Sequence, residues 1–275
     1  MSPHPRPPRR APPLCSPCAG IGIRYFANQH KSKQLPSMHA SCCEGQGTRL
    51  FGSLPEYLFT YAYNSGGGAP LALYVDIYAQ SNITLPYPAA ASPGVATLAV
   101  DTVWPYGAAV ALTLTLPAAG ALDLALRVPA WLAAPSMAVT VNGAPAGAGA
   151  PGSYLHLAGP WRAGANQIAL ALPMALSSAR YEGASQLPPY ERWSTLYGPV
   201  LLAFTGPWNA SVDGLTLLAP EVQPAQPAAW LQPAADGNAL HFEAPTMPGV
   251  AALPYYEVQQ EGQLFSNYPC FAPTH

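Results

Sequence analysis

The sequence predicts a mainly β protein built from antiparallel β-sandwich domains. Between residues 71 and 172, short runs alternate between apolar and polar residues, and turn-forming residues separate the runs at short, regular intervals. No long helical pattern lies between these runs. Charged residues make up only 9% of the chain, beside 34 prolines and 24 glycines, and this composition excludes a coiled coil, a long helical bundle and a highly charged disordered chain.

The chain begins with a segment rich in proline and arginine. Residues 1–18 read MSPHPRPPRRAPPLCSPC, and prolines at this density exclude a helix. The segment also lacks the apolar stretch of a secretory signal. Because of the high proline content, we expect residues 1–20 to be disordered. Cys15 and Cys18 form a Cys-x-x-Cys pair. One hypothesis is a zinc site shared with Cys42 and Cys43; the alternative, two unpaired thiols, is favoured because the second pair is adjacent rather than two residues apart.

The charge distribution is uneven along the chain. Residues 1–43 carry six basic and no acidic residues, whereas the remainder carries five basic and thirteen acidic residues. The body of the protein is therefore a poor electrostatic match for nucleic acid. No uninterrupted apolar run is long enough for a transmembrane helix, so we expect no membrane partner; the compartment stays open.

A helix is expected next, over residues 47–63. Apolar residues at Leu50, Leu54, Leu58 and Tyr61 form a helical stripe, and Pro55 is expected to kink or split the helix. The run of Asn, Ser and Gly at 64–68 ends it.

Strands follow in two regions. In the first region, period-two patterns predict strands over 71–79, 95–103, 110–116, 121–128, 138–142 and 167–172, with turns at 93–94, 117–120 and Asn142-Gly143. The second region is looser. Its predicted strands are 195–204, 239–243 and 255–259, with a long loop at 220–235, and a domain boundary is expected near residue 185.

The least common feature of the sequence is the vicinal pair Cys42-Cys43, just before the predicted helix. A thiol at a helix start has a lowered pKa because it feels the positive end of the helix dipole. Two thiolates also suit zinc. Taken alone, the pair is better explained as two small buried apolar residues.

The residues around this pair resemble glycoside hydrolase family 127, the β-L-arabinofuranosidase-like enzymes. The resemblance spans residues 21–275. The matching motifs are CCEGQGTR at 42–49, SLPEY at 53–57, LYVDIY at 73–78, RVPAW at 127–131, VNG at 141–143, WRAG at 161–164, LPM at 172–174, YGPVLLA at 197–203 and PYYE at 254–257.

The resemblance implies an (α/α)6 barrel followed by β-sandwich domains, with a zinc ion held by three cysteines and a glutamate. It implies that Cys42 is the nucleophile of a retaining hydrolase and a zinc ligand, and that Cys43 is a zinc ligand only. A separate glutamate acts as acid and base. The implied partner is a glycan with terminal β-L-arabinofuranose.

The sequence departs from the family where the remaining groups should lie. Only 41 residues precede Cys42, and none is Asp or Glu, so the acid/base and the carboxylate zinc ligand are missing. We therefore expect the C-terminal part of such an enzyme, inactive alone. The expected parts are a disordered 1–20, the end of the catalytic barrel at 21–70, a β-sandwich at 71–185 and a C-terminal β domain at 186–275. The alternative is a non-catalytic sandwich that binds carbohydrate or acts as a scaffold.

Other residues offer weaker candidates, and each has a structural interpretation that is favoured. The carboxylates of Glu44, Glu56 and Asp76 are expected to be surface or helix-start charges. The indoles of Trp131, Trp161 and Trp193 are expected in the core or at sheet edges rather than against sugars. His30 and His39 flank the cysteine pair and are expected to be solvated; Cys270 has no evident partner.

Overall fold

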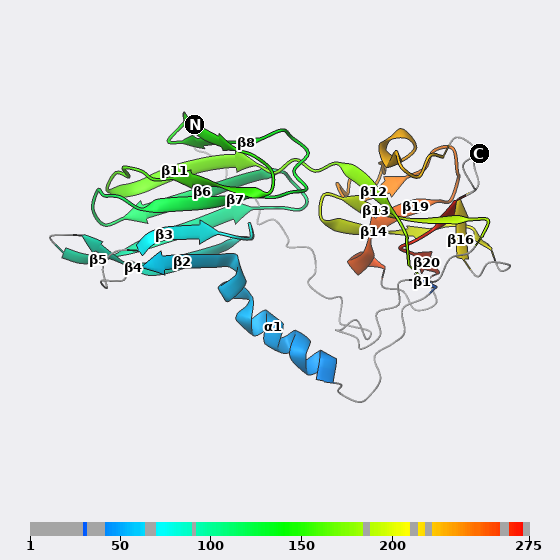
Figure 1. Cartoon of the computed structure of the whole chain (residues 1–275), viewed down its shortest axis with the longest axis horizontal. Coiled ribbons are helices and arrows are strands. Elements are labelled where there is room, and N and C mark those ends of the chain that lie inside the picture. Colours follow the sequence, from blue (N-terminus) through cyan, green and yellow to red (C-terminus); the bar gives the residue numbers. More distant parts are fainter. Residues whose placement is uncertain are drawn as a thin grey trace, which may run out of the picture.

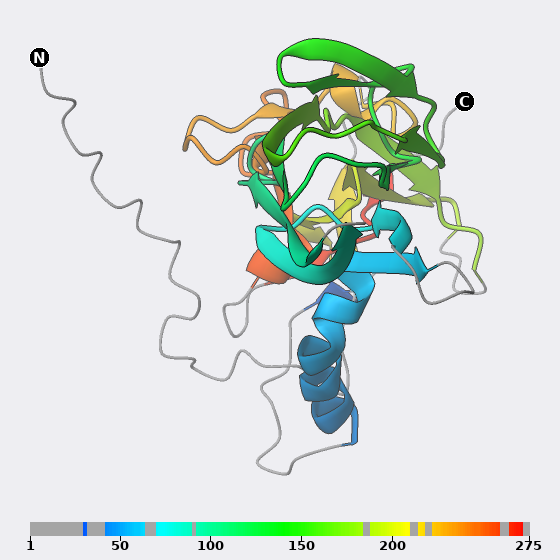
Figure 2. The same ribbon diagram turned by 90° about the vertical axis from the view of Figure 1, so that its left-hand side faces the viewer.

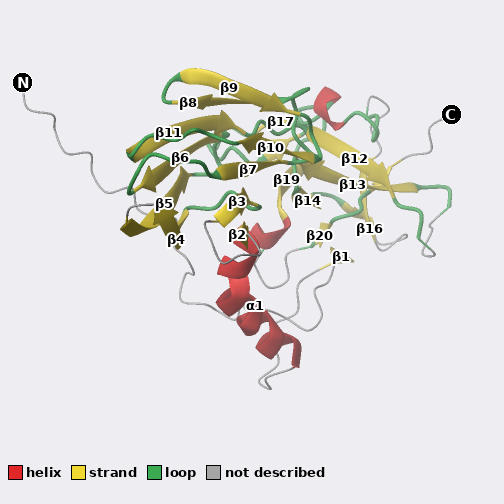
Figure 3. Ribbon diagram, turned by 60° about the vertical axis from the view of Figure 1, so that its left-hand side comes forward, coloured by secondary structure: helices red, strands yellow, loops and turns green. Residues whose placement is uncertain are grey.

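The computed structural model describes residues 30–31, 42–63, 70–89, 92–183, 188–209, 214–217, 222–258 and 264–271. The expected disordered segment 1–20, with Cys15 and Cys18, lies outside these residues, and so does His39. The predicted mainly β fold is confirmed: within the described ranges α1 (Cys42–Leu58) is the only α-helix, and nearly all other regular structure is strand (Figure 3).

Two β lobes lie side by side in Figure 1, and the first is a two-sheet sandwich. Its six-stranded sheet has the order β4-β5-β6-β11-β8-β9, and its four-stranded sheet has the order β10-β7-β3-β2. The strands are β2 (Phe59–Tyr63), β3 (Pro70–Val75), β4 (Ser81–Ala89), β5 (Ser92–Thr102), β6 (Ala109–Leu116), β7 (Asp123–Val128), β8 (Met137–Val141), β9 (Ala144–Gly149), β10 (Ser153–Leu157) and β11 (Gly164–Ala171).

Alternating apolar residues build the core between these two sheets. Leu73, Leu98, Leu112 and Leu124 are fully buried, and they come from both sheets. Along β6 every second residue is buried, as the period-two pattern predicted. All six strands predicted between 71 and 172 exist in this lobe, whereas β4, β9 and β10 were not predicted.

The predicted helix 47–63 is wrong at both ends, and it begins at Cys42, so the cysteine pair lies inside the helix rather than before it. The helix stops at Leu58, and residues 59–63 form β2, which pairs antiparallel with β3. Leu58 and Phe59 are buried in the sandwich core, and the Leu58 carbonyl accepts hydrogen bonds from the amides of Asp76 (2.9 Å) and Ile77 (3.3 Å). Pairing with β3 overrides the helical periodicity because the residues gain a ladder and a buried face.

Away from this junction, α1 projects from the sheets (Figure 2). Four of its large apolar side chains are exposed: Leu50 (55%), Phe51 (67%), Leu54 (40%) and Tyr57 (52%). Pro55 lies inside the helix, which the structure records as one continuous element, so the chain does not split there.

The second lobe contains one branched sheet of eleven strands around a separate core. Its elements are β1 (His30–Lys31), β12 (Leu176–Arg180), β13 (Glu191–Tyr197), β14 (Val200–Thr205), β15 (Trp208–Asn209), β16 (Gly214–Leu217), η1 (Pro227–Ala229), β17 (Gln232–Pro233), β18 (Phe242–Glu243), β19 (Ala251–Pro254), η2 (Tyr255–Glu257), β20 (Phe265–Ser266) and β21 (Cys270–Phe271). Because β11 of the first lobe ends at Ala171 and β12 already pairs with β13, the second lobe begins before the expected boundary near residue 185.

Two strand predictions in this lobe are wrong. Residues 195–204 form a hairpin rather than one strand, because Gly198 adopts a φ of +55° and reverses the chain between β13 and β14. Residues 255–257 form a 3-10 turn instead of a strand. Pro254 ends β19 there because it has no amide to donate to a further rung of the ladder.

One turn follows the sequence prediction closely. Asn142 (φ +51°) and Gly143 (φ +84°) connect β8 and β9 in the left-handed conformations that a two-residue hairpin turn requires. None of the described helices has the length and apolar character needed to cross a bilayer.

Candidate functional site

The predicted nucleophile lies at the start of α1. Cys42 and Cys43 are the first two residues of this helix, whereas their side chains fall outside the described part of the structure. The helix continues into β2 without a linker, and the buried Leu58 and Phe59 fix that junction to the sandwich core. The fold therefore joins the cysteine pair to the first sandwich through a single helix.

The described side chains, which do not include those of Cys42 and Cys43, form no zinc site of their own. No group of three or more His, Cys, Asp or Glu side chains lies close enough to hold a metal among them. The remaining described thiol, Cys270, is buried in the second lobe, and burial raises its pKa, which disfavours the thiolate that a metal needs. Two thiols make only half of a tetrahedral zinc set, so Cys42 and Cys43 by themselves do not fit a zinc ion.

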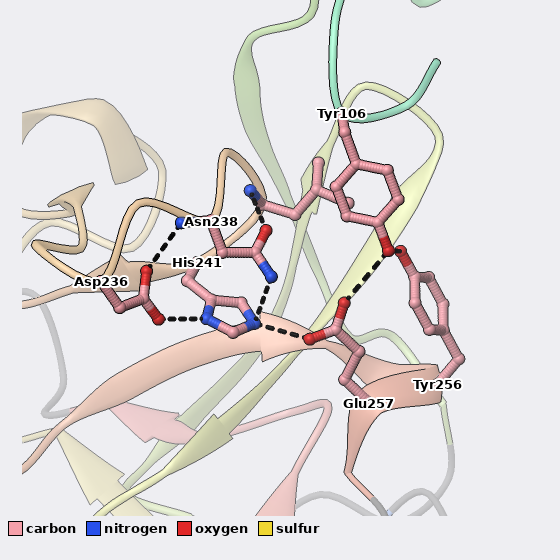
Figure 4. Close-up of polar contacts among 7 residues, drawn as sticks. Tyr106, Asp236, Asn238, His241, Tyr256 and Glu257 are labelled. Atoms are coloured by element: carbon pink, nitrogen blue, oxygen red, sulfur yellow. Dashed lines mark hydrogen bonds and ion pairs between the residues drawn. The ribbon is translucent and has the colours of Figure 1, made fainter. Parts of the chain in front are cut away.

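A polar cluster that the sequence did not reveal lies where the two lobes meet (Figure 4). The imidazole of His241 contacts two carboxylates: Nδ1 lies 2.5 Å from Asp236 Oδ2, and Nε2 lies 2.6 Å from Glu257 Oε2. The hydroxyl of Tyr106, from the loop between β5 and β6, donates to Glu257 Oε1 at 3.4 Å. Burial lowers the pKa of His241, but hydrogen bonds to the two carboxylates outweigh it, so the pKa is raised.

This arrangement suits a structural junction better than a catalytic base. Only the doubly protonated imidazolium donates to both carboxylates at once. Neither ring nitrogen of His241 is then left for a substrate or a metal. No sequence motif predicted the cluster. Asp236, His241 and Glu257 come together only through the turn after β17 and the 3-10 turn at 255–257.

A cavity of about 170 Å³ lies at the end of the first sandwich. Its walls are Asp76, Ile77, Tyr78, Trp104, Arg127, Pro129, Trp131, Leu172 and Pro199. The Trp104 and Trp131 rings stack with centroids 5.8 Å apart and 22° between planes. Trp104 and Arg127 were not predicted as site residues, although Arg127 and Trp131 both belong to the RVPAW motif.

The weaker sequence candidates fall into two groups, those in the core or on the surface and those that line the cavity. Trp161 is buried in the sandwich core and donates its indole N–H to the Leu122 carbonyl at 2.7 Å, which confirms its structural interpretation. Trp193 packs against the core of the second lobe and bonds to Glu191. Glu56 is exposed on α1. Asp76 and Trp131 differ from these because they face the cavity.

Comparisons with known proteins agree with this architecture. Residues 72–174 match the family model described as β-L-arabinofuranosidase, GH127 middle domain. No curated protein matches the sequence.

Solved structures share the fold at low sequence identity. A glycoside hydrolase superposes with a TM-score of 0.56 at 18% identity over 92% of this chain. A GH127 β-L-arabinofuranosidase from Geobacillus stearothermophilus T6 gives 0.57 at 18% identity over 90%, and a GH127 β-arabinofuranosidase gives 0.61 at 16% over 93%.

The chain spans 44%, 39% and 43% of the lengths of those three structures. They therefore share the fold of these residues while containing more than half of their own length beyond it. The resemblance to glycoside hydrolase family 127 is confirmed: residues 72–174 match the family's middle-domain model, and the fold of the chain is similar to that of part of the solved GH127 structures.

Proposed function

We propose that this chain is the β-sandwich part of a retaining glycoside hydrolase, and that it positions a cysteine nucleophile at the start of α1. The observation that carries the proposal is the direct connection from the Cys42-Cys43 helix into β2 of a sandwich that matches the GH127 middle-domain model. A helix anchored at Leu58 and Phe59 holds its far end in a defined direction. The first turn of a helix also favours a thiolate.

The proposed chemistry follows the family resemblance. The sulfur of Cys42 attacks the anomeric carbon of a terminal β-L-arabinofuranose, and a carboxylic acid protonates the departing oxygen as the glycosidic bond breaks. Water then attacks the same carbon, the carbon–sulfur bond breaks, and the carboxylate takes the water proton. Each attack inverts the configuration of the anomeric carbon, so the two steps together retain it. The carboxylic acid is not among residues 1–41, so we propose that turnover needs residues beyond this chain.

Zinc binding by Cys42 and Cys43 stays a prediction. The two cysteines would supply two thiolates, which is half of a tetrahedral zinc set. The purified 275-residue chain is therefore expected to hold well below one zinc per chain. One tightly held zinc per chain, lost on Cys15→Ser, would instead support the shared site of Cys15, Cys18, Cys42 and Cys43.

The decisive experiment uses the protein encoded by the complete native transcript, read to its true start codon. We expect it to release arabinose from an aryl β-L-arabinofuranoside, and we expect Cys42→Ser to abolish that release. Cys270→Ala is the matched control because Cys270 is buried in the second lobe and outside the proposed site. Full activity in Cys42→Ser would disprove the nucleophile, and hydrolysis by the 275-residue chain alone would disprove the need for further residues.

A second candidate function is a non-catalytic sandwich that binds carbohydrate. The observation that favours it is the cavity with the Trp104–Trp131 stack, which lies on the sandwich itself. This candidate predicts saturable glycan binding without turnover.

A further inference from the structure

We propose that the cavity at the end of the first sandwich binds one neutral sugar unit with neighbouring hydroxyl groups. The cavity shares no residue with the Cys42 site. The choice of a sugar as ligand rests on the glycoside hydrolase function proposed above, whereas the cavity and its polar groups are properties of the described structure.

The position and size of the cavity suit a single ring. Its walls come from chain segments at the ends of β3, β5, β7 and β11, and Pro199, at the β13–β14 turn, closes it from the second lobe. Ligand sites concentrate at such junctions between domains. A volume of about 170 Å³ accommodates one monosaccharide unit but not an oligosaccharide.

Two indoles supply the apolar surface. Trp104 and Trp131 are partly exposed and stack on each other. The flat faces of indole rings pack well against the C–H face of a sugar ring, which is apolar while its edge carries hydroxyls. The Trp104 indole N–H is buried and has no hydrogen-bond partner among the described residues, so this wall also carries an unsatisfied donor.

A carboxylate and a guanidinium supply the polar recognition. The Asp76 carboxylate is held by the hydroxyls of Thr60 (2.8 Å) and Tyr154 (2.5 Å), which donate to its two oxygens. Beside it, Nη1 of Arg127 donates to the Asp76 backbone carbonyl at 3.3 Å. Within the described structure, the other Arg127 N–H groups have no acceptor. The Asp76 carboxylate can accept a hydrogen bond from one sugar hydroxyl, while the Arg127 guanidinium donates to the oxygen of the neighbouring hydroxyl.

The charges of the pair select for a neutral ligand. Asp76 and Arg127 carry opposite charges on the same cavity wall, so the site is close to neutral overall. A uronic acid would gain an attraction to Arg127 but would place its carboxylate near Asp76, where like charges repel. The structure therefore favours a neutral pentose or hexose unit over an acidic one.

The test is a titration of the 275-residue chain followed by tryptophan fluorescence. The probes are methyl β-L-arabinofuranoside, methyl β-D-galactopyranoside and galacturonic acid. We expect a saturable signal with at least one of the neutral glycosides and a weaker one with the acid. Arg127→Gln should weaken binding by about tenfold because it removes charged donors. Trp131→Ala should abolish binding, and Trp131→Phe should retain part of it.

Controls separate recognition from folding and from catalysis. Arg180→Gln changes an exposed arginine of the second lobe and should bind like the unchanged chain. Trp131 packs against the core, so a thermal melt accompanies each variant; if Trp131→Ala unfolds, Arg127→Gln decides. No saturable signal, unchanged affinity in Arg127→Gln, or preference for the acid would overturn the inference. Cys42→Ser should leave this binding unchanged, so failure here is distinct from failure of the hydrolase proposal.

Discussion

Replacing Trp161 by phenylalanine tests whether this indole serves the core rather than a sugar. Trp161 is 3% exposed and donates to the Leu122 carbonyl at 2.7 Å. The substitution removes the donor from a buried carbonyl, which costs about 1–3 kcal/mol, and the smaller ring leaves a void worth about 1 kcal/mol. We expect the free energy of unfolding of the first lobe to fall by about 2–4 kcal/mol.

The assay is urea unfolding followed by far-ultraviolet circular dichroism. Trp131→Phe is the matched control, because it makes the same change in the same lobe at a partly exposed ring whose indole N–H has no partner among the described residues. We expect the control to lose less than about 1 kcal/mol. A loss in Trp161→Phe within about 0.5 kcal/mol of zero, or no larger than in the control, would refute the assignment of Trp161 to the core.

The remaining predictions concern pH, association and a turn. Because the pKa of His241 is raised in the folded chain, its stabilising effect should be complete below about pH 6.5 and be lost as pH rises through the folded pKa. Unfolding midpoints of the unchanged chain and His241→Asn should therefore converge as the pH rises above the folded-state pKa of His241, and a constant gap would contradict this. The exposed face of α1 should make the chain associate, and Phe51→Gln should reduce association in light scattering; a monodisperse unchanged chain would argue against it. Asn142→Ala should lower the free energy of unfolding by about 1–2 kcal/mol because alanine strains at positive φ, whereas Asn142→Gly should cost less; equal losses would contradict the reasoning.

Local sequence patterns predicted the first lobe well for a physical reason. Its strands lie in two facing sheets, so most inward side chains are apolar and many outward ones are polar, and this alternation is visible in the sequence as a period of two. The strands that escaped prediction carry weaker signals. β9, for example, reads APAGAG and is exposed over five of its six residues.

Tertiary pairing decided the points where prediction failed. Residues 59–63 continue a helical pattern, yet they gain more by pairing with β3 and burying Phe59. Residues 195–204 look like one strand until Gly198 reverses the chain. In both places, a partner distant in sequence or a single backbone conformation outweighs local preference.

The candidate site shows the same division. Its predicted residues, Cys42 and Cys43, were found by a local motif, and the structure adds that the helix beginning with them is anchored in the sandwich core. The cavity residues were not predicted as a group, because Asp76, Trp104 and Arg127 come from three separate strand ends.

By itself, the sequence determined the fold class, the positions of six sandwich strands, the Asn142-Gly143 turn and the family resemblance, because each depends on residues near one another in the chain. Only the tertiary structure decided where α1 ends, which tryptophans are buried, and which charged side chains meet at the cavity and around His241. Those outcomes depend on contacts between segments that are far apart in sequence, and no local pattern encodes such contacts.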